Sequence, residues 1–371
     1  MSKFLRILTI CGACISFYIG AGFATMQEVA QYEASYGKRF PIVILVAAAI
    51  YIYTNISFAT NGHRLGIEHG GDIYGAYCSI CGKKFKKLAA AFFDVFSAIF
   101  CYMSFVVMCG GASSTVAQQW GMPIWVGAVV LSILVVITTI CGLDSIVDVL
   151  SKIGPLIIVT ILLVSVVTAF MGWNHFFVNI AAIDKGEYVN SIKQVGNNNP
   201  LYSGASYGGF VILWFAAFMA EIGAKNCLTE VNKGMLLSAV FIFGAATICC
   251  IALIGNVDTI AGTDIPALYL AQQISPVLAQ VFAIIICAGI YTSATPLLWT
   301  GVRKVAHEGT ARYIILTIIG GIVGCVIACW VPYQGLINVL YGINGYLGFL
   351  LVFFMIAYDV KTHMSKKNMT K

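Results

Sequence analysis

Near the middle of the first apolar segment of the chain stands the stretch Ile15-Ser16-Phe17-Tyr18-Ile19-Gly20-Ala21-Gly22-Phe23-Ala24-Thr25-Met26-Gln27-Glu28. Two glycines flank one alanine, and an amide and a carboxylate follow within a segment that is otherwise apolar. Close helix packing through small residues would explain the glycines, but it would not explain Glu28. A carboxylate inside a membrane is costly and usually lines a cavity. We therefore predict that the first helix is interrupted at Gly20–Gly22.

The composition predicts that lipid surrounds most of the chain. Of the 371 residues, 60% are hydrophobic and only 10% are charged, and the mean hydropathy is +0.91. A soluble domain carries about 25% charged residues. The formal net charge is +6, but the basic residues stand in short runs between apolar segments, as topology signals do. We therefore expect no nucleic-acid partner.

Ten segments are long and apolar enough to cross a bilayer, which takes about 20 residues. We predict an all-α integral membrane protein that forms a single transmembrane domain over residues 1–371. The segments are approximately 5–34 (interrupted), 40–61, 88–118, 123–141, 153–172, 203–223 (a second candidate for interruption), 234–256, 276–302, 312–331 and 335–358. A loop over 173–203 and a short helix over 264–273 are predicted on the outer side.

The distribution of Lys and Arg predicts the orientation. With the N-terminus inside, 17 of these residues fall in cytoplasmic segments and only four fall outside, namely Lys38, Arg39, Lys185 and Lys193. An excess of positive charge on the cytoplasmic side is the usual rule for multi-pass proteins. We predict a plasma-membrane protein with both termini in the cytoplasm.

Two further segments carry candidate functional residues. The eighth contains Gly289, Thr292 and Ser293, whose oxygens could bind a small cation, although hydroxyls in membrane helices more often bond a carbonyl of their own helix. The sixth contains the pair Gly208-Gly209 and then the aromatic residues Trp214, Phe215 and Phe218. If the chain is an inverted repeat, the sixth helix corresponds to the first and should also break.

These residues make the chain resemble the YkvI-type membrane proteins, a family within the amino acid–polyamine–organocation superfamily of transporters. The resemblance covers nearly the whole chain. Its most specific elements are Gly20-Ala21-Gly22-Phe23-Ala24 with Gln27-Glu28, and Ile290-Tyr291-Thr292-Ser293-Ala294. Supporting elements are Met108-Cys109-Gly110-Gly111-Ala112, Ser151-Lys152-Ile153-Gly154-Pro155-Leu156 and Gly345-Tyr346-Leu347-Gly348.

The resemblance implies the LeuT fold, in which two inverted repeats of five helices cover about 1–172 and 203–360. It implies that helices 1, 2, 6 and 7 rock against a scaffold of helices 3, 4, 8 and 9, with the solute between the breaks of helices one and six. In relatives that use sodium, the ion lies between helices one and eight. Its ligands here would be the carbonyls of Ser16, Ile19 and Gly289 and the hydroxyls of Thr292 and Ser293.

The chain also departs from its sodium-coupled relatives. Those relatives place Asn and an Arg-Phe-Pro run after the glycines, whereas this chain continues from Phe23 to Glu28 without them. A second sodium site and an arginine gate therefore cannot be carried over. Glu28 is instead a candidate for proton coupling.

The predicted function is secondary active transport of a small organic solute, such as an amino acid or a related zwitterion, coupled to Na⁺ or alternatively to H⁺, with no other cofactor. The solute's anionic group would meet N–H groups that the break leaves free. The predicted substrate residues are Gly20, Ala21, Gly22, Phe23, Gln27, Trp214, Phe215 and Phe218. A solute sensor that binds without transport remains an alternative. A membrane enzyme is less favoured, because Glu28, Asp94 and Glu221 are spread over three segments. The sequence does not predict an oligomeric state.

Overall fold

The computed structural model describes residues 2–67, 71–141, 147–303 and 305–369, and every regular element within them is a helix. In chain order they are α1 (Lys3–Tyr18), α2 (Ala21–Ala24), α3 (Gln27–Tyr32), η1 (Ala34–Arg39), α4 (Phe40–Leu65), α5 (Asp72–Cys78), η2 (Ser79–Cys81), α6 (Lys83–Trp120), α7 (Ile124–Cys141), α8 (Val147–Met171), η3 (Trp173–His175), α9 (Phe176–Asp184), α10 (Val189–Ile192), α11 (Pro200–Phe210), α12 (Ile212–Lys225), α13 (Leu228–Gly255), α14 (Val257–Ile260), α15 (Pro266–Ile274), α16 (Pro276–Arg303), α17 (Ala311–Trp330) and α18 (Tyr333–Met369).

The long helices confirm a multi-pass membrane protein. Among the described residues, seven helices are long and apolar enough to cross a membrane, and the number rises to nine if two bent helix pairs each count as one span. The bent pairs are Leu156–Met171 with Trp173–Asp184, at 60°, and Pro200–Phe210 with Ile212–Lys225, at 45°. The first predicted segment is not in this count, because its longest piece, α1, has only 16 residues.

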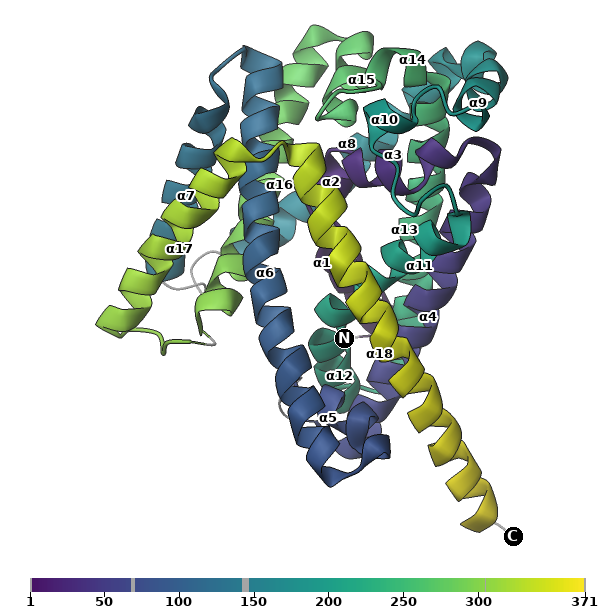
Figure 1. Ribbon diagram of the computed structural model, residues 1–371, viewed down its shortest axis with the longest axis vertical. Helices are drawn as coiled ribbons and strands as arrows, with labels where there is room; N and C mark the ends of the chain where they lie inside the picture. The colour runs from purple at the N-terminus through teal and green to yellow at the C-terminus, as the bar shows by residue number, and fades with distance from the viewer. Residues whose placement is uncertain (1, 68–70, 142–146, 304, 370–371) are drawn as a thin grey trace.

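The helices pack in two groups. In one group α6, α7, α16 and α17 contact one another, and in the other α4 contacts α11, α12 and α13, while α1 packs against α13. These are the two sets of helices that the resemblance implies. Figure 1 shows α7 and α17 on one side of the molecule, with α4, α11 and α13 on the other side and α18 crossing between them.

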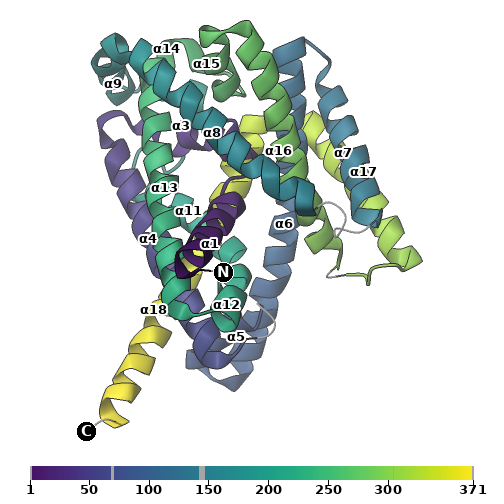
Figure 2. The ribbon, with the colours of Figure 1, turned by 180° about the vertical axis from the view of Figure 1, so that it is seen from behind.

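The two ends of the molecule differ in structure. The short helices α9, α14 and α15 lie at one end, and α5 and the C-terminus lie at the other (Figures 1 and 2). Following the predicted topology, we call these the outer end and the inner end. The short helix predicted at 264–273 is present as α15, and the segment predicted as a loop over 173–203 contains η3, α9 and α10.

Glycines allow α11 and α18 to approach closely. A Cβ atom added to Gly209 would lie 2.2 Å from the Gly345 carbonyl oxygen, and one added to Gly348 would lie 1.9 Å from the Gly209 carbonyl oxygen. Small residues at such contacts are typical of membrane helices, because van der Waals packing drives their association. This contact holds α18 against the half of the sixth span that precedes its bend.

Candidate functional site

The first helix is interrupted where the sequence predicts it. α1 ends at Tyr18, and the backbone is extended at Ile19 (φ −79°, ψ 99°) and at Gly20 (φ −97°, ψ −171°). Ala21 and Gly22 then begin the single turn of α2. The extended residues therefore start one position before the predicted break and end within it.

A second interruption, which the sequence analysis missed, follows directly. Met26 adopts the left-handed conformation (φ 60°, ψ 8°) between α2 and α3. Such a conformation is uncommon for a residue other than glycine, and no glycine marks this position. The Thr25 carbonyl, freed by the turn, accepts a hydrogen bond from the N–H of Ala267 at 3.1 Å. The Thr25 hydroxyl donates to the Gly22 carbonyl at 3.0 Å and lies 3.1 Å from the Tyr333 hydroxyl.

The double turn folds Glu28 back over α2. A Cβ atom added to Gly22 would lie 1.9 Å from Glu28 Oε1, so the carboxylate lies directly against the Gly22 backbone. Glu28 is 2% exposed, and its Oε2 atom has no hydrogen-bond partner among the described residues. A second carboxylate, Glu33, is fully buried, and neither of its oxygens has a hydrogen-bond partner in the part of the chain that the structure describes.

The predicted residue Gln27 lies beside Glu28. Its side chain is 1% exposed, and its backbone N–H donates to the Thr25 hydroxyl at 3.4 Å. Its Oε1 atom has no hydrogen-bond partner within the described ranges. Phe23 is buried as well, with its ring centroid 6.4 Å from that of Tyr18.

The aromatic residues predicted in helix six meet helix one at the break. The Phe17 ring stacks on Phe218 at 4.5 Å between centroids and makes edge contacts with Phe215 at 5.1 Å and with Trp214 at 5.9 Å. A Cβ atom added to Gly20 would lie 3.7 Å from the Trp214 ring. The structure thus brings Gly20 and the three aromatic residues together around Phe17.

Helix six bends rather than unwinds. α11 ends at Phe210 and α12 begins at Ile212, with an angle of 45° between them. The bend lies between the two predicted positions, after Gly209 and before Trp214. The Phe210 carbonyl accepts a hydrogen bond from the Asn344 side-chain amide of α18, which satisfies a carbonyl at the bend.

Four tyrosine hydroxyls that the sequence analysis did not identify are buried near the carboxylates. Tyr18, Tyr32, Tyr207 and Tyr341 are each at most 2% exposed, and no described residue forms a hydrogen bond with their hydroxyls. The ring centroids of Tyr32 and Tyr207 are 5.1 Å apart, and those of Tyr18 and Tyr207 are 6.4 Å apart. Tyr18 immediately precedes the break, but Tyr32, Tyr207 and Tyr341 come from segments with no shared sequence signal.

The residues predicted to bind sodium lie on α1, on the extended residue that follows it, and on α16. The Thr292 hydroxyl donates to the Gly289 carbonyl at 2.7 Å, as expected for a hydroxyl in a membrane helix. Ser293 and Ile19 are half-buried, and Ser16 is exposed. α1 packs mainly against α13, whereas α16 packs against α2, α6 and α8. No group of three or more His, Cys, Asp or Glu side chains that could hold a metal ion occurs among the described residues.

Hydrogen bonds connect the helices above the break at the outer end. Gln118 of α6 donates to the Ile265 carbonyl at 3.0 Å and accepts from its N–H at 3.1 Å. The Ser114 hydroxyl of α6 donates to Asp264 at 2.8 Å. The Gln31 side chain donates to the Gln334 carbonyl at 3.1 Å. The segment 264–267 therefore connects α6 to the turn at Thr25.

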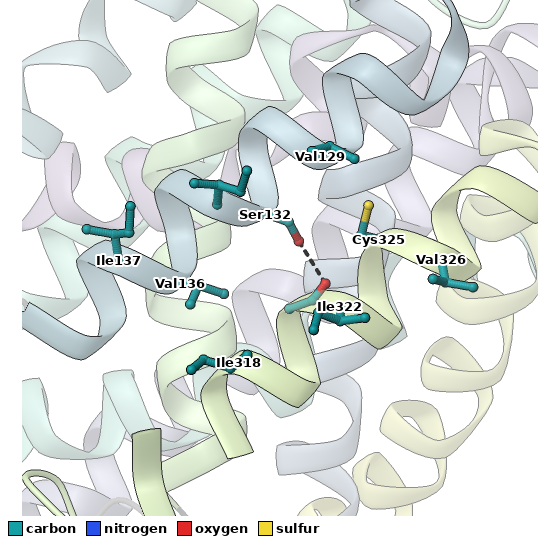
Figure 3. A pocket seen from close by; sticks show the side chains of 10 residues that line it. Val129, Ser132, Val136, Ile137, Ile318, Ile322, Cys325 and Val326 are labelled. Atoms are coloured by element: carbon teal, nitrogen blue, oxygen red, sulfur yellow. Dashed lines mark hydrogen bonds between the residues drawn. The ribbon is translucent and has the colours of Figure 1, made fainter. Parts of the chain in front are cut away.

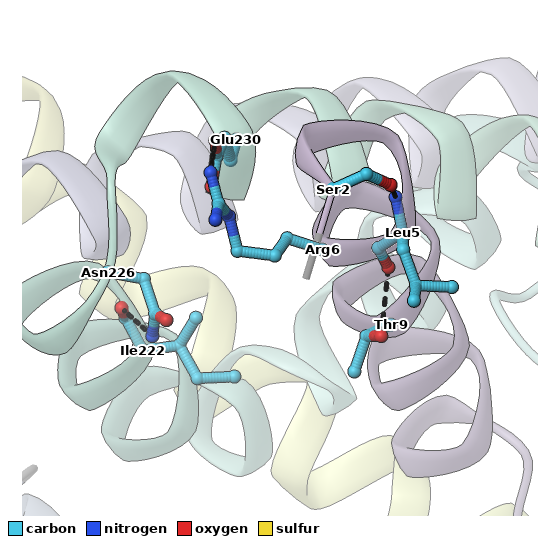
Figure 4. Close-up of polar contacts among 7 residues, drawn as sticks. All are labelled: Ser2, Leu5, Arg6, Thr9, Ile222, Asn226 and Glu230. Atoms are coloured by element: carbon cyan, nitrogen blue, oxygen red, sulfur yellow. Dashed lines mark hydrogen bonds and ion pairs between the residues drawn. The ribbon is translucent and has the colours of Figure 1, made fainter.

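At the inner end, α1 is attached to α13 by an ion pair. The Arg6 guanidinium donates two hydrogen bonds of 2.7 Å to the Glu230 carboxylate, one to each oxygen (Figure 4). Glu230 is 5% exposed. This two-point geometry fixes the orientation of both side chains and attaches the first half of helix one to the group that contains α13.

A groove lies between α7 and α17 (Figure 3), and its lining residues come from these two helices, not from helix one. Aliphatic side chains such as Val129, Ile133 and Ile322 form most of its lining. Its serine, Ser132, already donates to the Gly321 carbonyl at 2.8 Å. The groove is therefore suited to lipid chains rather than to a polar solute.

Comparison with known proteins identifies the fold. No family model matches the sequence, and no curated protein matches it. A histidine-to-alanine variant of the Eremococcus coleocola manganese transporter has a similar structure, with a TM-score of 0.57 and 15% identity over 96% of this chain and 78% of that one. The same transporter in complex with an aromatic bis-isothiourea compound gives a TM-score of 0.55 and 14% identity over the same shares of the two chains. This likeness shows that the chain has the LeuT-like fold.

Proposed function

We propose that this protein is a secondary active transporter of a small organic solute, such as an amino acid or a related zwitterion. The observation that carries the proposal is the interrupted first helix, whose break lies beside the bent sixth helix and its aromatic residues. Interrupted helices near mid-membrane are where transporters of this architecture bind their solutes. The likeness to a solved transporter supports the same reading.

The proposed solute contacts are those predicted from the sequence. The N–H groups of Ala21, Gly22 and Phe23 would meet the anionic end of the solute, with Gly20 and Gln27 beside them. Trp214, Phe215 and Phe218 would border its apolar part, because their rings surround Phe17 next to the break. The manganese in the name of the similar structure belongs to that protein. We propose an organic solute here because amides, hydroxyls and aromatic rings surround the break, with Glu28 as the carboxylate that lies against it.

Transport would proceed by alternating access. The group of α1, α4, α11, α12 and α13 would move against the group of α6, α7, α16 and α17. The resemblance to YkvI-type proteins and the distribution of basic residues support a plasma-membrane protein made of two five-helix repeats with both termini in the cytoplasm.

The proposed coupling ion is sodium, bound by the carbonyls of Ser16, Ile19 and Gly289 and the hydroxyls of Thr292 and Ser293. In the present arrangement Thr292 bonds Gly289, and its oxygen retains lone pairs that could bind a cation. Proton coupling through Glu28 is the alternative.

Removal of the Thr292 and Ser293 hydroxyls tests whether sodium binds at the proposed site. We expect Thr292→Ala with Ser293→Ala to abolish the rise in melting temperature that sodium produces, because a ligand that binds the folded state stabilises it. Potassium at equal concentration is the control for ionic strength. A double variant that retains the wild-type sodium response would show that the ion binds elsewhere or that protons drive transport.

Uptake into proteoliposomes tests transport itself. A transporter exchanges labelled for unlabelled solute across the membrane, whereas a sensor with the same fold binds the solute but shows no counterflow. Binding without counterflow would therefore favour the sensor alternative.

A further inference from the structure

The carboxylate of Glu28 is placed as part of an internal site. It lies against the backbone of Gly22, inside the double turn of helix one, and its Oε2 atom has no hydrogen-bond partner. Any larger residue at position 22 would occupy its place. The carboxylate therefore adjoins the break where the solute is proposed to bind.

The charges around Glu28 do not neutralise it. Among the described residues, the titratable groups that interact with it are the carboxylate of Glu33 and the hydroxyls of five tyrosines on four helices, namely Tyr18 (α1), Tyr32 (α3), Tyr207 (α11), Tyr333 (α18) and Tyr341 (α18). All of these groups are acidic. Burying an ionised carboxylate without a positive partner costs free energy. We therefore expect this site to bind a cationic group or a proton.

The surrounding side chains supply what an ammonium group needs. An ammonium group donates three hydrogen bonds and accepts none. The Tyr207 hydroxyl lies near the Glu28 carboxylate, and the Tyr18 hydroxyl lies near that of Tyr207, but within the described residues neither hydroxyl is close enough to a partner for a hydrogen bond of normal length. The Gln27 carbonyl oxygen is also buried and without a partner. Tyrosine rings add favourable cation–π contacts with a desolvated ammonium.

We propose that Glu28 binds an ammonium group of the transported solute, which limits the solutes to amines and to zwitterions that carry a free ammonium. This inference rests on the proposed function and narrows its substrate class. A zwitterion would place its ammonium group on Glu28 and its carboxylate on the neighbouring N–H groups. A solute whose amine is blocked by acetylation would leave the carboxylate unpaired and would be rejected.

Matched sets of solutes test the proposal on the purified full chain. Each of the standard amino acids is compared with its decarboxylated amine and with its N-acetyl derivative by thermal shift and by competition for uptake. We expect at least one amino acid or amine to bind, and its N-acetyl derivative to bind at least tenfold more weakly. Equal binding of the acetylated compound would overturn the role of Glu28 and leave the transporter proposal standing. If no compound of any set binds, the assignment of an ammonium-bearing solute to Glu28 is wrong, and the amino-acid form of the proposed function is wrong with it.

Two isosteric variants test which buried carboxylate binds the ammonium group. Glu28→Gln should weaken binding of the amine at least tenfold and remove the preference for amine over N-acetyl compound. Glu33→Gln is the matched control, because Glu33 is also a buried carboxylate but follows α3, whereas Glu28 lies within α3 and against Gly22. Retention of the preference in Glu28→Gln, or its loss only in Glu33→Gln, would contradict the assignment. If Glu28→Gln does not fold, the comparison of free amines with N-acetyl compounds on the wild-type chain still decides whether the site requires an ammonium group.

Discussion

At the scale of single residues, Gly22 is the position where the helix-one backbone lies directly against a side chain of the proposed site. A methyl group in Gly22→Ala would lie 1.9 Å from Glu28 Oε1 and would force the carboxylate away. Overpacking of a buried position usually costs about 1–3 kcal/mol. We therefore expect a lower melting temperature in detergent, together with weaker binding of any ammonium-bearing solute.

Gly12→Ala in α1 is the control for this substitution, because a Cβ atom there has no neighbour within 4 Å. Alanine is favoured over glycine inside a helix by about 1 kcal/mol, so Gly12→Ala should melt at the wild-type temperature or slightly above it. Equal melting of the two variants would mean that Glu28 can leave Gly22 without cost.

The sequence predicts the residues of the break better than it predicts their surroundings. Gly20 and Glu28 stand out because two glycines and a carboxylate are unusual within one apolar helix. Met26 carries no comparable signal, because its left-handed backbone depends on the packing of α2 against α3. Tyr32 and Tyr207 become neighbours only when helices one and six pack together, and a single sequence without an alignment does not reveal that pairing.

At the scale of helices, the contact between α11 and α18 depends on glycine. Gly348→Ala would place a methyl group 1.9 Å from the Gly209 carbonyl oxygen, and backbone atoms cannot give way as a flexible side chain can. We expect the two helices to separate slightly, which would cost about 1–3 kcal/mol. Because this contact lies next to the bend at Val211, the variant should also show faster hydrogen exchange at the end of α11.

Helix α18 also provides the control for Gly348→Ala. Gly342 of α18 has no atom within 4 Å of its Cβ position, so Gly342→Ala should leave both the melting temperature and the exchange of α11 unchanged. Wild-type behaviour of Gly348→Ala would show that the close contact is not needed for the packing of α18.

Helix boundaries follow the sequence closely where hydropathy changes sharply. The predicted segments at 123–141 and 276–302 match α7 and α16 within a residue or so. In the segment over 173–203 the sequence is less informative. Its many Asn and Gly residues predict a loop, whereas Phe176–Asp184 form the helix α9. The bend of helix six was expected only from the repeat, and its position at Val211 depends on the packing of α18 against α11.

At the scale of the whole molecule, the polar connections at the two ends differ. At the outer end, the segment 264–267 bonds both to α6 and to the turn at Thr25, so it connects α6 to the interrupted part of helix one. At the inner end, the Arg6–Glu230 pair joins helices of the same group. Ser16, in the last turn of α1, is exposed. If the chain is the transporter that we propose, this arrangement is the one expected of a state that is closed at the outer end.

Gln118 tests this interpretation, because it makes two hydrogen bonds to Ile265 across the outer end. Each intramolecular hydrogen bond contributes about 0.5–1.5 kcal/mol, so Gln118→Leu should raise the population of the outward-open state severalfold. Hydrogen–deuterium exchange would report this as faster exchange in α15 and at Thr25, with no change at α5. Gln119→Leu is the control, because the buried Oε1 atom of Gln119 has no hydrogen-bond partner. Unchanged exchange in Gln118→Leu would mean that the outer end is held by apolar packing, and the closed state would then resist any single polar substitution there.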